Sequence, residues 1–63
     1  MSVKDLYVLV PDEQEMRIYD LAFQIFEGKA RDIPTATMFR TISHIKADSF
    51  VMEVWLNGKE AII

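Results

Sequence analysis

The fold predicted for this chain depends on the stretch EQEMRIYDLAFQIFE, residues 13–27. On a helical wheel, with about 100° per residue, its polar side chains gather on one narrow arc and most of the rest is apolar. Asp12 precedes the stretch and Glu15 follows three residues later, which is the spacing of a capping box at the start of a helix. Gly28 is a typical residue at a helix end. We therefore predict one main amphipathic helix over residues 13–27.

Strands are predicted on both sides of this helix. Residues 5–10 (DLYVLV) and residues 50–56 (FVMEVWL) are rich in β-branched and aromatic side chains, which favour strands. Pro11 ends the first strand because it has no amide proton to donate to a sheet. Residues 57–58 (Asn-Gly) favour a two-residue hairpin turn, because a type I′ turn needs positive φ at both positions. Residues 59–63 would then form the returning strand.

The segment 35–46 is ambiguous. Met38, Ile42 and Ile45 recur at helical spacing, which favours a helix. The threonines around them are β-branched and favour a strand instead. We prefer the helix and keep the strand as an alternative. The whole chain, residues 1–63, is then a single small α+β domain of order β-α-(α or β)-β-β, with the main helix packed on a mainly antiparallel sheet.

Length and composition limit how this domain can be stabilised and where it works. A chain of 63 residues without cysteine has a small core and no disulfides, so its stability must come from a well-packed core or from a second chain. Neither a signal peptide nor a run of about 20 apolar residues is present, so we expect a cytoplasmic protein without membrane contact. The net charge of -3 disfavours nucleic acid as the first partner, because such binding relies on Lys and Arg at phosphates.

The sequence carries more apolar surface than one small domain can bury. The apolar arc of the predicted helix is about twice as wide as one sheet face requires. Both faces of the predicted strands are also rich in apolar residues, although a sheet with one wet face should alternate. We therefore expect an interface, formed first with a second copy in a homodimer. The predicted interface residues are Tyr7, Leu9, Tyr19, Phe23, Phe26, Val51 and Trp55.

Residues suited to catalysis or cofactor binding are few. His44 is the only histidine, so a two-histidine metal site is impossible within one chain. No cysteine is available as a nucleophile, and no serine lies in a G-x-S-x-G context. With glycine only at positions 28 and 58, no glycine-rich phosphate loop can form. We predict no enzymatic activity, no catalytic residues, no metal site and no cofactor.

Two DNA-binding families share local features with this sequence. The run LVPDEQE, residues 9–15, resembles the strand-to-helix entry of ribbon–helix–helix repressors, which implies a second helix within residues 35–46. Residues 35–46, followed by the Asn57-Gly58 hairpin, resemble the recognition helix and wing of winged-helix proteins. The ribbon–helix–helix resemblance implies an obligate dimer, and either resemblance implies a DNA-binding regulator. The matching basic contact patch is Arg40, His44 and Lys46, with Lys59 on the wing.

These observations lead to two functional hypotheses. The first is a small regulatory or inhibitory protein that acts through protein–protein interaction, as a homodimer and on another protein that the sequence does not identify. The alternative is a DNA-binding transcriptional regulator.

Overall fold

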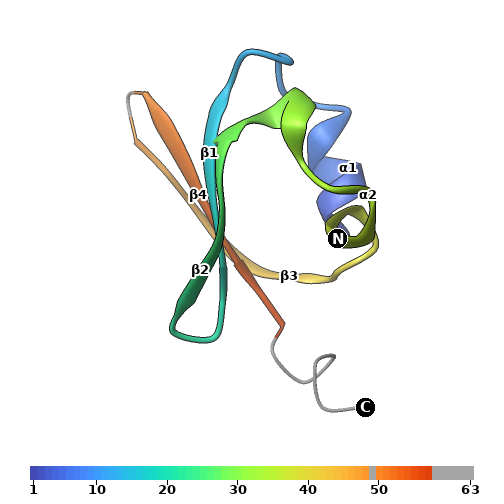
Figure 1. The fold of residues 1–63 in the computed structure, drawn as a ribbon, viewed down its shortest axis with the longest axis vertical. Coiled ribbons are helices and arrows are strands. Elements are labelled where there is room, and N and C mark those ends of the chain that lie inside the picture. The colour runs from blue at the N-terminus through green and yellow to red at the C-terminus, as the bar shows by residue number, and fades with distance from the viewer. Residues whose placement is uncertain (49, 58–63) are drawn as a thin grey trace.

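In a computed structural model, which describes residues 1–48 and 50–57, the chain forms a four-stranded mixed sheet with short helices on one face. Figure 1 shows α1 and α2 on the same side of the sheet, with no described helix over the other side. The α+β class predicted from the sequence is therefore confirmed. The elements in chain order are α1 (Val3–Tyr7), β1 (Glu15–Asp20), β2 (Phe23–Lys29), the 3₁₀ helix η1 (Ala30–Asp32), α2 (Thr35–Met38), β3 (Ile42–Ala47) and β4 (Val51–Leu56).

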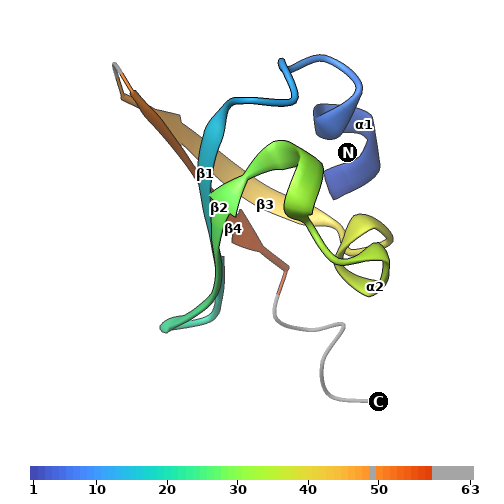
Figure 2. The ribbon, with the colours of Figure 1, turned by 45° about the horizontal axis from the view of Figure 1, so that its top comes forward.

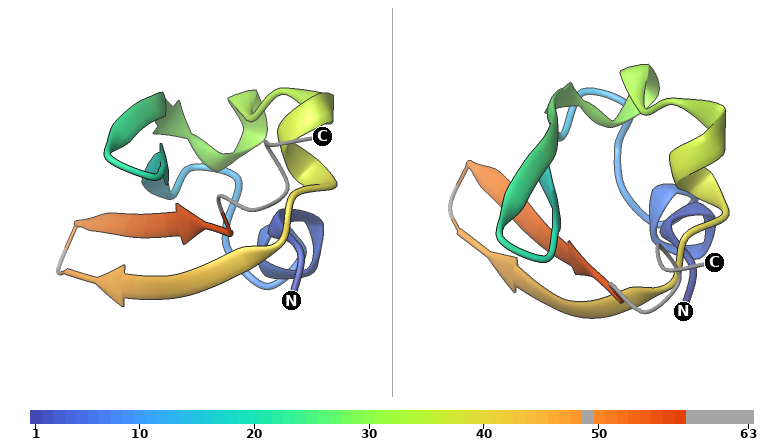
Figure 3. Two further views of the ribbon diagram at one scale, coloured as in Figure 1. Left: turned by 90° about the horizontal axis from the view of Figure 1, so that it is seen from below. Right: turned by 60° about the horizontal axis from the view of Figure 1, so that its bottom comes forward.

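The sheet consists of two hairpins joined through their first and last strands. Its strand order is β2-β1-β4-β3, with β1 parallel to β4 and both outer pairs antiparallel. Figure 2 shows the same elements with the top turned forward, and Figure 3 shows β3 and β4 side by side with opposite directions. Two of the three pairings are antiparallel, as the sequence predicts.

The predicted main helix over residues 13–27 is wrong, because this stretch forms the β1–β2 hairpin. In β1 the side chains alternate: Met16 and Ile18 are buried, whereas Arg17 and Tyr19 point the other way. Residues 21–22 form the turn between the strands. Side-chain direction therefore repeats every two residues and not every 3.6. The wide apolar arc of the helical wheel contains residues from both faces of a hairpin.

The predicted strand over residues 5–10 is also wrong. Residues 3–7 form the helix α1 instead, and Ser2 and Asp5 form the capping box at its start. The Ser2 hydroxyl accepts from the Asp5 amide at 3.2 Å, and the Ser2 amide donates to Asp5 Oδ2 at 3.0 Å. The resulting helix α1 buries Val3 and Leu6, which lie three residues apart and so on one face. Tertiary burial and the cap outweigh the strand preference of this apolar run.

The ambiguous segment 35–46 contains both kinds of structure, since α2 (Thr35–Met38) ends four residues before β3 (Ile42–Ala47) begins. The ribbon–helix–helix and winged-helix resemblances both place a longer helix in this segment, so they do not extend to the fold described for it. The predicted strand over residues 50–56 is confirmed as β4, with its start one residue later. Of the predicted turn at Asn57-Gly58, only Asn57 belongs to the described residues. The predicted strand over residues 59–63 lies outside them.

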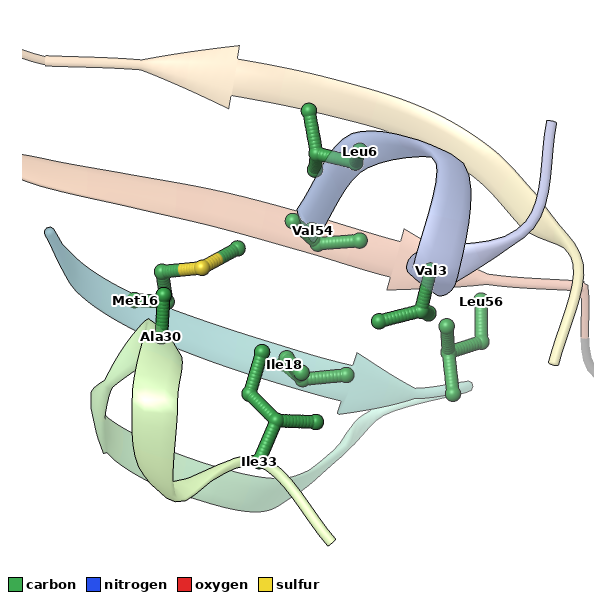
Figure 4. Close-up of a cluster of buried hydrophobic side chains, with 8 residues drawn as sticks. All are labelled: Val3, Leu6, Met16, Ile18, Ala30, Ile33, Val54 and Leu56. Atoms are coloured by element: carbon green, nitrogen blue, oxygen red, sulfur yellow. The ribbon is translucent and has the colours of Figure 1, made fainter. Parts of the chain in front are cut away.

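The core lies between the sheet and the helices. Figure 4 shows the buried side chains that the described residues contribute to it, which come from both central strands, from α1 and from the segment after β2. They are Val3, Leu6, Met16, Ile18, Ala30, Ile33, Val54 and Leu56. This arrangement leaves the opposite side of the sheet without a covering element among the described residues, and that side carries the candidate functional site.

Candidate binding surface

The side of the sheet that faces away from the helices is called the open face below. It is built by the strand positions that alternate with the buried core residues, as Arg17 and Tyr19 do in β1 and Glu53 and Trp55 do in β4. Strand pairing aligns these positions in three rows across the sheet. The residues of the open face are Glu15, Arg17, Tyr19, Gln24, Glu27, Lys29, His44, Lys46, Val51, Glu53 and Trp55.

The aromatic row contains three stacked rings, contributed by β1, β4 and β3. The Tyr19 and Trp55 ring centroids are 5.1 Å apart with planes at 17°, and those of Trp55 and His44 are 4.6 Å apart with planes at 9°. These separations match the spacing of about 4.8 Å between neighbouring strands. The rings therefore stack on one another across three neighbouring strands. Gln24 occupies the β2 position of the same row.

The charged row lies next to the aromatic row and alternates in sign. Its register runs across the four strands through Glu27, Arg17, Glu53 and Lys46. Arg17 Nε donates to Glu27 Oε2 at 2.9 Å, and this hydrogen bond is the main reason why the pKa of Arg17 is raised. Cross-strand pairs of opposite charge stabilise a sheet by small amounts.

Tyr19 connects the two rows. Its hydroxyl donates to Glu53 Oε2 at 3.0 Å. The pKa of Tyr19 is raised above its ordinary value of 10.0, first because the phenol is partly removed from water and second because the neutral hydroxyl donates to Glu53. The phenol is therefore held as a neutral donor, and it orients the Glu53 carboxylate within the charged row.

The third row, called the outer row, lies at the end of the sheet where β1 begins. Lys29, Glu15 and Val51 occupy it on β2, β1 and β4. Asp48 follows β3 and stands opposite Val51, since its amide donates to the Val51 carbonyl at 2.9 Å.

Glu13 forms a small ion-pair cluster beside the outer row. Its carboxylate accepts from Lys29 Nζ at 2.7 Å and from the Arg31 guanidinium at 2.5 Å. The Lys29 hydrogen bond, followed by the charge of Arg31, lowers the pKa of Glu13. The cluster ties the loop before β1 to the end of β2.

Of the predicted interface residues, Tyr19, Val51 and Trp55 come together on the open face. Tyr7 and Phe26 are half-buried against the core on the helical side. Leu9 and Phe23 are both 72% exposed, but Leu9 lies in the turn after α1 and Phe23 at the start of β2. The seven residues therefore do not form one surface.

The predicted basic patch is divided. His44 and Lys46 lie on β3 and belong to the open face, whereas Arg40 lies between α2 and β3. The Arg40 guanidinium contacts Asp20 Oδ2 at 3.3 Å and the Asn57 carbonyl at 3.5 Å, with only about a fifth of each charged side chain exposed. Arg40 thus joins the end of β1 to the residue that follows β4.

Of the charged row, only Lys46 is predicted from the sequence, as part of the basic patch. Arg17 and Glu27 fall instead on the polar arc of the predicted helix, and Glu53 is given no role. The alternation of Met16, Arg17, Ile18 and Tyr19 was the available signal, because it is typical of a strand with one buried face.

Within residues 1–48 and 50–57, the structure contains no pocket and no group of three or more side chains that could hold a metal ion. None of the helices in this part has the length and apolar character needed to cross a membrane. The chain matches no protein-family model, and neither a curated protein nor a solved structure resembles it closely enough to count as a match.

Proposed function

We propose that this chain is a cytoplasmic, non-enzymatic regulatory or inhibitory protein that acts by binding other protein chains through the open face of its sheet. The observation that carries the proposal is the stacked row of Tyr19, Trp55 and His44, held in place on a face without a covering element among the described residues. Tyr and Trp are the residue types that most often dominate the energy of protein interfaces.

The chemistry around the aromatic row supports a protein partner. The charged row, which carries both signs, lies directly beside the rings, and protein–protein interfaces combine aromatic residues with polar ones. The rings are also held in place before binding, because Tyr19 donates to Glu53 and stacks on Trp55. Little side-chain entropy is then lost on association.

The same geometry is less suited to nucleic acid. Bases bind to aromatic side chains by stacking on flat ring faces. Here Trp55 lies between Tyr19 and His44 and stacks on both, so its two faces are already occupied. The acidic residues Glu15, Glu27 and Glu53 also stand among the basic ones, so the open face is not a basic surface of the kind that phosphates require.

Binding through this face can be tested with two variants that each replace an apolar residue by glutamate. Trp55→Glu alters the aromatic row, and Leu9→Glu alters an exposed apolar residue outside the open face. A protein retained from a lysate of the source cell by the full chain is purified, and its affinity is measured by titration calorimetry. We expect Trp55→Glu to weaken this binding by at least about 30-fold, the effect of losing a hot-spot residue, and Leu9→Glu to leave it unchanged.

Two outcomes would contradict the proposal. One is equal binding of the purified partner by wild type and Trp55→Glu while circular dichroism shows that both are folded. The other is a mobility shift of random duplex DNA at low salt that is lost in Lys46→Glu, because such a shift would indicate phosphate binding at the open face.

A further inference from the structure

The charges of the open face follow a pattern that depends on the position across the sheet. In the charged row, the outer strands β2 and β3 carry Glu27 and Lys46, and the central strands β1 and β4 carry Arg17 and Glu53. The centre of the sheet lies between β1 and β4. Each charge in this row is therefore opposite in sign to the charge at the equivalent position on the other side of the centre. The outer row repeats the pattern at its two ends, with Lys29 on β2 and Asp48 after β3.

We propose that the first partner of the open face is a second copy of this chain, related by a two-fold axis parallel to the strands and passing between β1 and β4. This inference rests on the proposed use of the open face as a binding surface. Such a rotation places β2 of one copy over β3 of the other and β1 over β4. Glu27 then faces Lys46 of the second copy, and Arg17 faces Glu53 of the second copy.

Because the axis is two-fold, each of these contacts occurs twice. Lys29 faces Asp48 of the second copy in the same way, so the interface contains six pairs of opposite charge. Two sheets packed face to face lie about 10 Å apart with their strands within about 30° of each other. Long side chains from both sheets can meet across this distance.

The charge pattern also excludes the other two-fold arrangement of the same faces. An axis perpendicular to the strands, running along the charged row, would place each strand over the same strand of the second copy. Glu27 would then face Glu27 of the second copy, and Lys46 would face Lys46. Like charges across an interface reduce affinity and select against that arrangement. The charged row is therefore compatible with only one of the two orientations.

The aromatic row completes the interface near the axis. The proposed rotation places Tyr19 over Trp55 of the second copy, twice, between the central strands. At the edges of the same row, Gln24 faces His44 of the second copy. Tyr19 and Trp55 then lie beside the axis, next to the charged row, and add to the interface the residue types that most often dominate binding energy.

The test uses two charge reversals, Glu27→Lys and Lys46→Glu, with mass measured by sedimentation equilibrium from low to high micromolar concentration. Wild type is expected to change from 7.3 kDa to twice that mass as concentration rises. Either variant alone places like charges at both symmetry-related contacts, so its association should weaken by about tenfold or more. An equimolar mixture should recover the wild-type association, because the introduced glutamate of one variant then faces the introduced lysine of the other.

Matched controls change the same charges on the helical side of the molecule. Lys4→Glu on α1 and Asp32→Lys on η1 alter exposed residues and should associate as wild type does. Circular dichroism confirms that each variant is folded. A wild-type mass of 7.3 kDa at every concentration would overturn the inference and leave the binding of a different protein to the open face as a separate question. A dimer that both reversals leave unchanged would also overturn it, since its interface would lie elsewhere.

Discussion

Among single side chains, Tyr19 shows most directly how the open face is kept ordered. It stacks on Trp55 and donates to Glu53, so one residue fixes both an aromatic and an acidic neighbour. Burial of its ring is the first cause of its raised pKa, and the hydrogen bond is the second. Its ionisation is therefore linked to folding.

The raised pKa of Tyr19 leads to a testable pH dependence. In a Tyr7→Phe variant, we expect the remaining phenol to ionise above 10.0, measured by ultraviolet absorbance of the phenolate. Because the folded pKa exceeds the unfolded one, the stability contribution is complete below pH 10.0 and is lost as pH rises through the folded value. Adding Glu53→Gln should lower the pKa only in part, since burial of the ring remains. Ionisation at 10.0 or below in the folded state would contradict the structure.

Leu21 provides a second prediction for a single residue. It occupies the β1–β2 turn with φ of 58°, a left-handed conformation that costs a residue with a Cβ about 1–2 kcal/mol. We expect Leu21→Gly to be more stable than Leu21→Ala by about 1 kcal/mol in urea unfolding, because only glycine relieves the strain. The alanine variant is the control, since it removes the exposed side chain but retains the Cβ. Equal stability of the two variants would show that the turn is not strained.

The individual elements show which parts of this fold could be predicted from the sequence. β4 is predictable because β-branched, aromatic and other apolar residues occupy all of its positions except Glu53, with Val54 and Leu56 buried. The hairpin over residues 13–27 is not predictable in the same way, because Asp12 and Glu15 have the spacing of a helix capping box and the turn at Leu21 contains no glycine or proline. Apolar residues on both strands of the resulting hairpin then appeared as one wide helical face.

The candidate site was predicted only in part for the same reason. The sequence predicts Tyr19, Val51 and Trp55 as interface residues because they are apolar or aromatic and lie on stretches that a small core cannot cover. Their alignment in one face depends on β1 lying beside β4, a contact between residues more than 30 positions apart. Local patterns contain no information about such a pairing.

The short helix α1 depends on its cap, and this can be tested at the level of the element. Ser2→Ala removes the hydroxyl that accepts from the Asp5 amide, so we expect the domain to lose about 1 kcal/mol of stability. Ser43→Ala is the matched control, because Ser43 is exposed on β3. Thermal unfolding of both variants provides the comparison, and an equal loss in the two would contradict a capping role for Ser2.

For the whole molecule, stability depends on the core, to which residues 1–48 and 50–57 contribute eight buried side chains. Ile18 is fully buried in a central strand, so Ile18→Ala should cost about 2–4 kcal/mol, which is most of the stability that a domain of this size has. Ile25 is 46% exposed on β2, and Ile25→Ala makes the same chemical change with little expected effect. Urea unfolding followed by Trp55 fluorescence should show the difference. Similar midpoints for the two variants would mean that the core is not where the structure places it.

The parallel pairing of β1 with β4 also affects how the chain folds during synthesis. The β1–β2 hairpin leaves the ribosome early, but its partner strand β4 ends at Leu56. Until β4 has emerged, Met16 and Ile18 lack the Val54 and Leu56 side chains that complete their core. Nascent chains that end before β4 should therefore be exposed to chaperones and proteases, and folding should occur in one late step when the last central strand arrives.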